Sequence, residues 1–326
     1  MTVFHRNEKK ELLPENLKGG VIAIGNFDGV HRGHRAVLDR ALELAASRNL
    51  PALALTFEPH PRTVFRPETP VFRLTPASVK ARVLEAEGFH SVIEYPFDRD
   101  FSQRSAEDFV KSILVDWLGA SAVVTGVDFH FGKGREGGPA YLMAAGKKHG
   151  FDVVLIDSFR DEGAEVVSSS RIRELLAQGD VAGAAGLLGY RYTVEAEVIG
   201  GQKLGRTLGY PTANMALPPE TELKPGIYAV RFRRADGSLH DGVASFGYRP
   251  TVTVDGAALL ETFIFDFSGD LYGEICSVSF FGHLRDELKF DGLETLVAQI
   301  KHDEDEARAL LSGVKPLGEL DARIAF

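Results

Sequence analysis

The segment GNFDGVHRGH, residues 25–34, decides the fold of the first half of the chain because it joins two different patterns. VIAIG (21–25) is a short apolar run typical of a buried strand, and apolar residues recur at helical spacing over 37–45. We therefore expect His31 and His34 to project from the first turn of a helix, where free backbone N–H groups and the helix dipole favour an anion.

The glycines and the acid of this segment strengthen that interpretation. Gly29 and Gly33 leave room for a phosphate chain to approach the backbone, and Asp28 is placed to bind a metal ion or the chain itself. A histidine pair on a helix is also common as a plain surface feature. The preceding strand, the glycines and the helix start together favour a nucleotide triphosphate site.

The length and composition favour two globular domains. The chain has 326 residues, a formal net charge of -9 and one cysteine, Cys276. The acidic balance argues against a nucleic-acid-binding protein, and a lone cysteine fits a reducing compartment. The polar N-terminus and the lack of an apolar run of about 18 residues argue against a secretory signal and a membrane span. We expect a cytoplasmic enzyme with small-molecule partners, and self-association stays open.

Residues 1–188 alternate short apolar runs with segments of helical period, which predicts an α/β, Rossmann-like domain with a doubly wound parallel sheet. Helices are expected over 76–88 and over 105–118, with Ser105 as an N-cap and Trp117 in the core. In such sheets ligands bind beyond the carboxyl ends of the strands, where GNFDGVHRGH lies. The expected strands are VIAIGN (21–26), PALALTF (51–57), SVIEYPF (91–97), AVVTGVDF (122–129) and DVVLIDSF (152–159).

Residues 189–326 alternate apolar and polar residues at period two between close turn signals, which predicts an antiparallel β-barrel. An amphipathic helix is expected over 292–311, with Leu293, Leu296, Val297, Ile300, Ala307 and Leu310 in one apolar stripe. The expected strands are YTVEAEVIG (192–200), GIYAVRF (226–232), HDGVASFG (240–247), LLETFIFDF (259–267) and EICSVSFF (274–281).

Three further segments of the first half lie at expected strand ends. TFEPHPR (56–62) carries His60, although its two prolines also suit a rigid turn. GVDFHFGKGREGG (126–138) carries Asp128 and two cations among its glycines, and a glycine-rich loop alone is weak evidence for phosphate binding. SSSRIR (168–173) opens a helix with hydroxyls and guanidiniums that suit a triphosphate, or it is a Ser-capped surface helix.

The expected chemistry of the first half is nucleotidyl transfer. The chain has no GxxxxGK[ST] segment, so it is not a P-loop enzyme. Imidazoles hydrogen-bond the α-phosphate oxygens and the leaving pyrophosphate as charge develops in the transition state. An incoming phosphate or carboxylate needs little activation by a base, so positioning and metal-assisted neutralisation dominate such a step.

Two segments of the second half carry candidate chemistry. GQKLGRTLGYPTAN (201–214) has glycines and cations that suit phosphates, and its Thr212 hydroxyl and Asn214 carbonyl suit a hard cation. In a barrel such a stretch is otherwise just a bent loop. Glu261 shares a strand face with three phenylalanines of LLETFIFDF, which suits a general base near neutral pH, or it is a rim residue paired with an arginine.

Taken together and in this order, the motifs resemble those of the bacterial bifunctional riboflavin kinase/FMN adenylyltransferases, often called FAD synthetases. The resemblance covers nearly the whole chain. HxGH also occurs in other nucleotidyltransferases and in aminoacyl-tRNA synthetases, whereas GRTLGYPTAN upstream of the Glu261 strand is much more specific. The matching segments are GNFDGVHRGH, TFEPHP, GVDFHFG, SSSRIR, GRTLGYPTAN, ETFIFDF and LRDELKFDGLETLVAQIKHDEDEA.

The resemblance implies that residues 1–188 transfer the adenylyl group of ATP to FMN, giving FAD and pyrophosphate. It makes His31 and His34 catalytic, and it gives the other motif residues roles in binding. The implied ATP-binding residues are Asn26, Phe27, Asp28, Gly29, Gly33, Ser168, Ser169 and Arg173, and His60 and Asp128 lie in segments that line the nucleotide and flavin sites.

For residues 189–326 the resemblance implies transfer of a phosphoryl group from ATP to riboflavin, giving FMN and ADP. Glu261 would be the catalytic base, and Thr212 and Asn214 would hold Mg²⁺. The implied ATP-binding residues of this kinase are Lys203, Gly205, Arg206, Thr207 and Pro211.

The departures from the family pattern are mild. Ser170 stands where threonine is commoner, Tyr210 where phenylalanine is more usual, and Val166 where some relatives carry arginine. Two other functions stay open. One is a monofunctional HxGH nucleotidyltransferase with a flavin-binding, non-catalytic barrel. The other is a tRNA-related nucleotidyl enzyme, against which the acidic balance counts.

Overall fold

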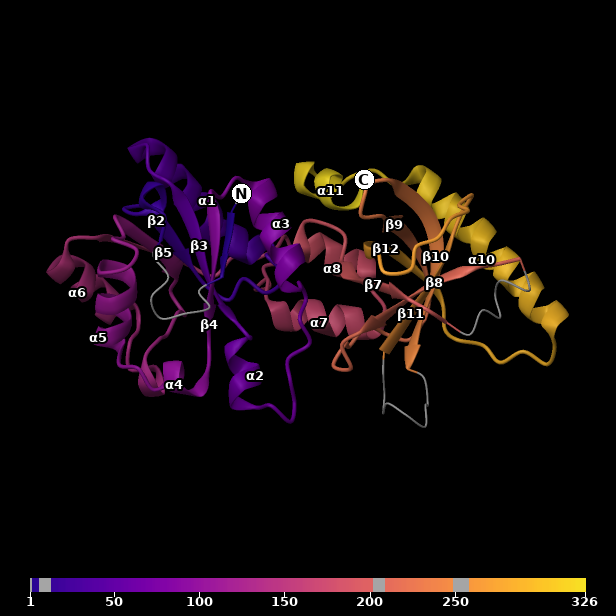
Figure 1. Cartoon of the computed structure of the whole chain (residues 1–326), viewed down its shortest axis with the longest axis horizontal. Coiled ribbons are helices and arrows are strands. Elements are labelled where there is room, and N and C mark those ends of the chain that lie inside the picture. Colours follow the sequence, from indigo (N-terminus) through magenta and orange to yellow (C-terminus); the bar gives the residue numbers. More distant parts are fainter. Residues whose placement is uncertain (1, 6–12, 202–208, 249–257) are drawn as a thin grey trace. The chain divides into compact units, whose positions relative to one another are not determined.

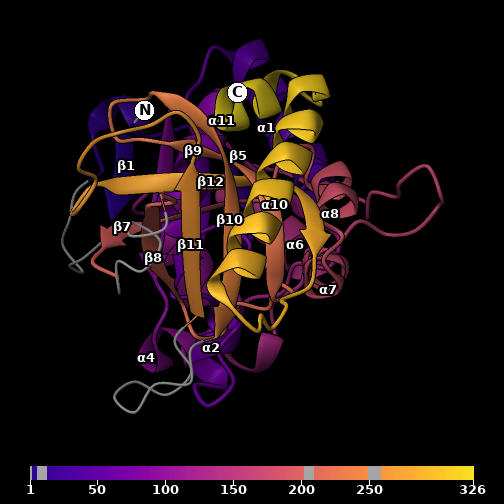
Figure 2. The ribbon, with the colours of Figure 1, turned by 90° about the vertical axis from the view of Figure 1, so that its right-hand side faces the viewer.

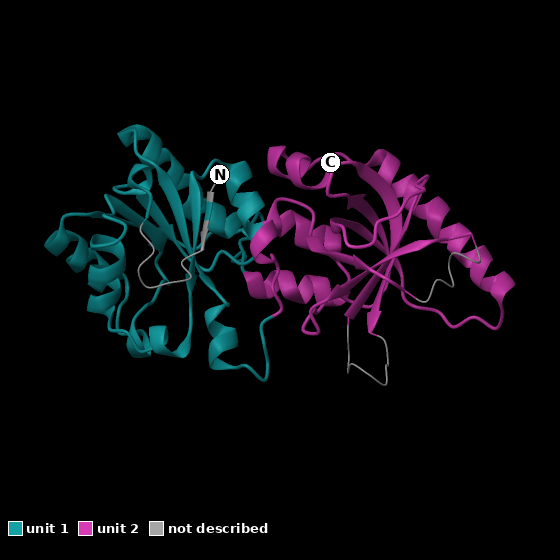
Figure 3. Ribbon diagram, viewed as in Figure 1, with its two compact units in different colours: residues 1–71, 80–168 teal, residues 72–79, 169–326 magenta. Residues whose placement is uncertain are grey.

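The computed structural model describes residues 2–5, 13–201, 209–248 and 258–326 (Figure 1). It divides into two compact units, residues 1–71 with 80–168, and residues 72–79 with 169–326 (Figure 3). Helices α7 (Ser169–Gln178) and α8 (Val181–Leu188) belong to the second unit, in which α8 packs against β12 (Ile275–Arg285). The functional boundary expected after residue 188 stays a prediction.

The first unit is built on a parallel sheet with the strand order β1-β4-β3-β2-β5-β6. Every strand pair in it is parallel. The five strands expected from the sequence are confirmed, and β1 joins them at one edge. The strands are β1 (Thr2–His5), β2 (Val21–Ile24), β3 (Ala52–Glu58), β4 (Ser91–Pro96), β5 (Ala122–Gly126) and β6 (Asp152–Ile156).

Helices cover both faces of this sheet, as expected for a doubly wound fold. Helix α1 (Arg32–Arg48) packs against β2, β3 and β5. Ile22 and Leu53 point to the opposite face, where they share one hydrophobic core with η2 (Phe109–Val115) and α6 (Pro139–His149). The other helices of this region are η1 (Glu15–Leu17), α2 (Pro61–Phe65), α3 (Ala77–Glu87), α4 (Arg99–Ser102), α5 (Ala106–Asp108) and η3 (Lys133–Arg135).

The helix expected over 105–118 forms, but most of it has wider turns than an α-helix. Ser105 caps it as expected, because its Oγ accepts a hydrogen bond from the Asp108 amide (3.1 Å). Beyond Asp108 the chain continues as a π-helix, in which the Asp116 amide donates to the Lys111 carbonyl (2.8 Å). Trp117 is buried in the core, as expected.

The order of the strands fixes where a ligand can bind. The chain places β3 and β4 on one side of β2, and then β5 and β6 on the other side. Parallel sheets bind ligands beyond the carboxyl ends of the strands at such a reversal. GNFDGVHRGH follows β2 and GVDFHFGKGREGG follows β5, so both loops lie at this edge.

The second unit contains a closed antiparallel barrel, which confirms the expected fold (Figure 2). The order β10-β11-β8-β7-β12-β9 closes because β9 also pairs with β10. Tyr228, Phe232, Phe246 and Phe280 are fully buried. Strand β8 was not among the expected strands, and it begins inside the PTAN motif. The strands are β7 (Thr193–Ile199), β8 (Thr212–Leu217), β9 (Gly226–Arg233), β10 (Leu239–Tyr248), β11 (Ala258–Ile264) and β12.

Helix α10 (Leu293–Gly313) confirms the expected terminal helix, but the expected apolar stripe is only partly right. Ala307 and Leu310 pack in a core cluster with barrel residues, whereas Leu293 is 58% exposed. The buried positions of α10 all lie in its second half, so its first turns stay outside the core. Helix α11 (Glu319–Ala325) follows. Among the described residues, no helix is both long and apolar enough to cross a membrane.

Candidate active sites

The two motif histidines form a stacked pair at the start of α1. Their ring centroids are 3.6 Å apart and their planes differ by 16°. His31 is the N-cap of α1 and not a first-turn residue, because its Nδ1 accepts a hydrogen bond from the His34 amide (3.3 Å). A neutral His31 that accepts at Nδ1 carries its proton on Nε2, so it can donate a hydrogen bond to a phosphate oxygen.

The surroundings of His34 keep it neutral. Burial lowers the pKa of His34 well below its ordinary value, and the nearby His31 and Lys80 lower it further. Its Nδ1 is buried and has no hydrogen-bond partner among the described residues. The ring of Phe27 meets the ring of His34 edge-on, with centroids 5.5 Å apart. His34 can therefore act as a neutral hydrogen-bonding group for an anion.

The loop between β2 and α1 is tightly folded. Phe27, Gly29 and Val30 all have positive φ angles, of 47°, 92° and 39°. Asp28 is buried within this loop. A Cβ on Gly33 would lie 2.9 Å from the Val167 carbonyl oxygen. Contact with the backbone of Val167 is therefore enough to require glycine at position 33, whether or not a phosphate binds nearby.

Lys80 of α3 is a residue of this site that the sequence did not single out. Its side chain is fully buried, and its Nζ donates to Glu58 Oε1 (2.7 Å), Thr56 Oγ1 (3.0 Å) and the Asn26 carbonyl (3.5 Å). The only signal in the sequence is its position: Val83 and Leu84, three and four residues later, are buried on the same helix face.

His60 and Asp128 both follow strands at the same edge of the sheet. His60 caps α2, because its Nδ1 accepts a hydrogen bond from the Arg62 amide (3.2 Å). His60 thus has a structural role as the N-cap of α2. Asp128 is exposed in the loop after β5, the strand that pairs with β2. Their roles in ligand binding stay predictions.

The SSSRIR segment opens α7, as expected. Ser168 is the last residue of the first unit, and Ser169 and Arg173 belong to the second unit. Arg173 Nε donates to the Phe72 carbonyl (2.7 Å). The role of these residues at a triphosphate stays a prediction.

The barrel brings the PTAN motif and Glu261 together. In the register of β8 against β11, Asn214 is paired with Glu261, and Thr212 with Phe263. Paired residues of adjacent strands point to the same face of a sheet. The ring of Tyr210 packs edge-on against Phe263 on this face, with centroids 5.0 Å apart. The two motifs therefore lie side by side on one face of the barrel wall.

Asn214 offers a suitable ligand for a hard cation. Its Nδ2 donates to the Thr212 carbonyl (3.1 Å), and its Oδ1 is buried with no hydrogen-bond partner among the described residues. A Cβ on Gly201 would lie 2.6 Å from Asn214 Nδ2, so the backbone after β7 closes over this amide. Amide and hydroxyl oxygens are ligands that Mg²⁺ accepts alongside phosphate oxygens. The residues present thus fit a magnesium ion.

Part of the predicted kinase site lies outside the described residues. These are Lys203, Gly205, Arg206 and Thr207 of the nucleotide-binding loop. Pro211 is described, and it is exposed immediately before β8.

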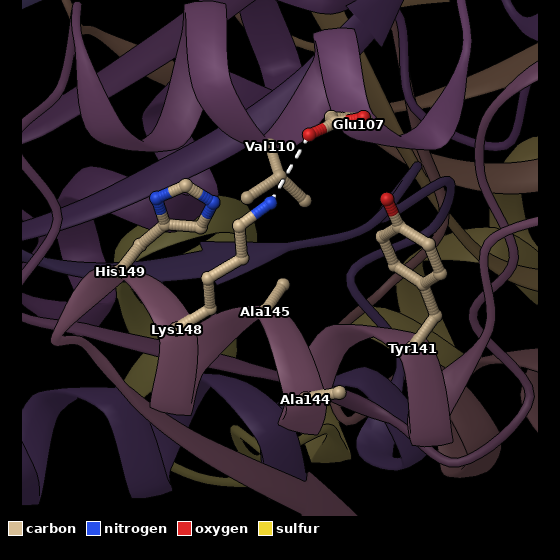
Figure 4. Close-up of a pocket in the computed structure, with 7 residues that line it drawn as sticks. All are labelled: Glu107, Val110, Tyr141, Ala144, Ala145, Lys148 and His149. Atoms are coloured by element: carbon tan, nitrogen blue, oxygen red, sulfur yellow. Dashed lines mark hydrogen bonds and ion pairs between the residues drawn. The ribbon is translucent and has the colours of Figure 1, made fainter.

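A pocket between the α5–η2 segment and α6 contains none of the predicted site residues (Figure 4). Lys148 and Glu107 face each other across it, with Nζ and Oε1 3.1 Å apart. The pocket is lined by Glu107, Val110, Tyr141, Ala144, Ala145, Lys148 and His149.

The fold and the two candidate sites define the class of protein, a transferase with two modules. One module is a nucleotidyltransferase-type α/β unit, and the other is a barrel whose residues suit phosphoryl transfer. Residues 13–171 match the FAD synthetase family and residues 188–311 match the riboflavin kinase family. The chain is 42% identical to the bifunctional riboflavin kinase/FMN adenylyltransferase of Pseudomonas fluorescens, over 92% of this chain and 95% of the relative. It is 40% identical to that of Haemophilus influenzae, over 91% and 96%. The chain belongs to this bifunctional family.

A solved structure is similar over nearly the whole chain. It is described as a macrolide-efflux protein from Streptococcus pneumoniae, and it is 29% identical in sequence with a TM-score of 0.82. The match covers 94% of this chain and 99% of that one. The fold of both units therefore recurs in a solved structure.

Proposed function

We propose that this chain makes FAD from riboflavin in two ATP-dependent steps. The barrel phosphorylates riboflavin to FMN, and the α/β unit adenylylates FMN to FAD with release of pyrophosphate. The main support for this proposal is that one chain contains two features. Asn214 is paired with Glu261 in the barrel, and His31 and His34 stack in the α/β unit. Purified protein with Mg²⁺, ATP and riboflavin should yield both FMN and FAD on chromatography, and the absence of both products would overturn the proposal.

In the adenylyl transfer an oxygen of the FMN phosphate attacks the α-phosphorus of ATP. The bond from this phosphorus to the bridging oxygen breaks, and pyrophosphate leaves with the bonding electrons. His31 and His34 would hydrogen-bond the α-phosphate oxygens and the leaving group, where negative charge grows. Asn26, Phe27, Asp28 and Gly29 would hold ATP from the loop, and Ser168, Ser169 and Arg173 would bind its phosphates.

An aromatic group at the same sheet edge suits the flavin ring of FMN. Phe65 on α2 is 59% exposed, and its ring packs edge-on against Phe97, with centroids 5.8 Å apart. The ring of Phe57 on β3 also packs edge-on against Phe97, with centroids 6.0 Å apart. An exposed aromatic ring that packs against other aromatic rings is well suited to stack on a flat heterocycle. We assign this group, with His60 and Asp128, to the flavin and nucleotide sites.

In the kinase step the ribityl 5′-hydroxyl of riboflavin attacks the γ-phosphorus of ATP, and ADP leaves. Glu261 would accept the hydroxyl proton, which makes this oxygen the nucleophile. Thr212 and Asn214 would hold Mg²⁺, which neutralises charge on the ATP phosphates. The other ATP-binding residues of this step are Lys203, Gly205, Arg206, Thr207 and Pro211.

We place the protein in the cytoplasm. Its one cysteine, Cys276, is buried, and burial raises the pKa of its thiol to about 11. The thiol therefore stays protonated at neutral pH, which suits a structural role in a reducing compartment.

A further inference from the structure

Lys80 joins the two loops that form the adenylyltransferase site. It comes from α3, and the Asn26 carbonyl that it reaches begins the loop leading to the histidine pair. Thr56 Oγ1 accepts a hydrogen bond from Lys80 Nζ and itself donates to the same Asn26 carbonyl (3.0 Å). The third acceptor, Glu58, is the last residue of β3 and lies within the TFEPHPR segment.

A buried ammonium is costly unless it is paired, so its partners must stay in place. Lys80 and Thr56 are both fully buried, and Glu58 is 22% exposed. Removing a charge from water costs free energy that only well-placed acceptors recover. The three acceptors therefore stay at a fixed separation around one nitrogen atom, which links the end of β2 to the end of β3.

We propose that Lys80 is a positioning residue for adenylyl transfer: by holding the Asn26 carbonyl and the Glu58 carboxylate, it sets the loop that presents His31 and His34 to ATP. This inference rests on the proposed function of the α/β unit. The charge of Lys80 also acts on the pair, because it helps to lower the pKa of His34. Lys80 thus affects both the position and the charge state of the histidines.

The test replaces Lys80 with methionine, which keeps most of the length of the side chain and removes its charge and donors. We expect kcat/KM for FAD formation from supplied FMN to fall about tenfold or more, while riboflavin phosphorylation in the same sample stays within about twofold of wild type. Lys80→Arg keeps the charge and should recover part of the loss. Lys148→Met on α6 replaces a lysine outside the site and should leave both activities unchanged.

A purely structural role gives a different result. If Lys80→Met only unfolds the first unit, FAD formation should return to the wild-type rate when the protein is cooled below its unfolding transition. If the loop is misplaced, FAD formation should stay slow in the folded protein. Thr56→Val removes one hydroxyl with little change in volume, and we expect a smaller loss of FAD formation with an unchanged transition.

Two outcomes separate this inference from the function on which it rests. If Lys80→Met and Thr56→Val both form FAD at the wild-type rate, the inference about Lys80 is wrong, and the proposed adenylyltransferase activity still stands. A wild-type protein that makes no FAD would overturn the proposed adenylyltransferase activity.

Discussion

His31 and His34 stack face to face at 3.6 Å, and the Nδ1 of the first caps the helix that carries the second. The side chain of His31 therefore caps α1, and its proposed role assigns the other ring nitrogen to a phosphate. If His31 has the proposed role, helix stability depends on its Nδ1 and phosphate binding on its Nε2, two effects that an alanine substitution would remove together.

Replacing His31 with asparagine should remove the catalytic group and keep the cap. Asparagine is among the best N-cap residues, so the free energy of unfolding should change little, whereas His31→Ala should lower it by about 1 kcal/mol. FAD formation should fall about 100-fold or more in both variants, and FMN formation should be spared. Chemical unfolding and separate assays of the two products check this. Equal loss of FMN and FAD formation would point to misfolding or shared chemistry.

Stability should depend on pH through His34. Its pKa in the folded state is lowered, first by burial, while in the unfolded chain it is about 6.5. Below about pH 6.5 the unfolded state therefore binds more protons, and the free energy of unfolding falls by up to about 1.4 kcal/mol per pH unit from this group. His34→Gln should flatten that decline. Urea unfolding of both proteins at about pH 7.5 and about pH 5.5 measures it, and parallel declines would refute the assignment.

Loss of the Glu261 carboxylate should affect only the kinase. Glu261→Gln should slow riboflavin phosphorylation about 100-fold or more, because no group then accepts the hydroxyl proton. FAD formation from supplied FMN should be unchanged. Glu197→Gln, at an exposed position of β7, is the matched control. Phosphorylation at the wild-type rate in Glu261→Gln would exclude Glu261 as the base.

Removing the exposed ring at position 65 should weaken FMN binding. Phe65→Ala should raise the KM for FMN about fivefold or more, since stacking on an aromatic ring contributes about 1 kcal/mol. The KM for riboflavin in the kinase reaction should not change. Met143→Ala, which truncates an exposed apolar residue of α6, is the control. An unchanged KM for FMN would place the flavin elsewhere.

The buried ion pair of the barrel should matter for its stability. Arg285 Nε and Nη2 donate to the two carboxylate oxygens of Asp303 at 2.8 Å and 2.6 Å. Asp303→Ala leaves this guanidinium without its carboxylate, and we expect a loss of about 3 kcal/mol in the free energy of unfolding. Asp305→Ala, which breaks an exposed pair with Lys301 on the same helix, should cost at most about 0.5 kcal/mol. Similar losses in both variants would contradict the role of burial.

The sequence predicted those parts of the fold that depend on local patterns. Short apolar runs between turn signals marked the parallel strands, and period-two alternation marked most of the barrel. Strand β8 was missed because its residues belong to a motif that was interpreted as a loop. Leu293 was wrongly placed in an apolar stripe, because periodicity does not reveal which turns of a helix reach the core.

The same distinction between local patterns and distant contacts applies to the residues of the candidate sites. His31, Asn214 and Glu261 are visible as motif residues, and the structure adds their surroundings: the stacking, the cap and the strand register. Lys80 could not be predicted, because a lysine on a helix is ordinarily exposed and its acceptors come from β3 and from the loop after β2. Contacts between distant segments decide its role.

The central claim is that one chain performs two successive reactions, and a time course tests it most directly. Riboflavin, ATP and Mg²⁺ are mixed with the purified protein, and FMN and FAD are quantified separately by chromatography. We predict that FMN appears first and FAD follows, that His31→Asn accumulates FMN, and that Glu261→Gln makes FAD only from supplied FMN. Formation of FAD from riboflavin by Glu261→Gln at the wild-type rate, or of neither product by the wild type, would contradict the account.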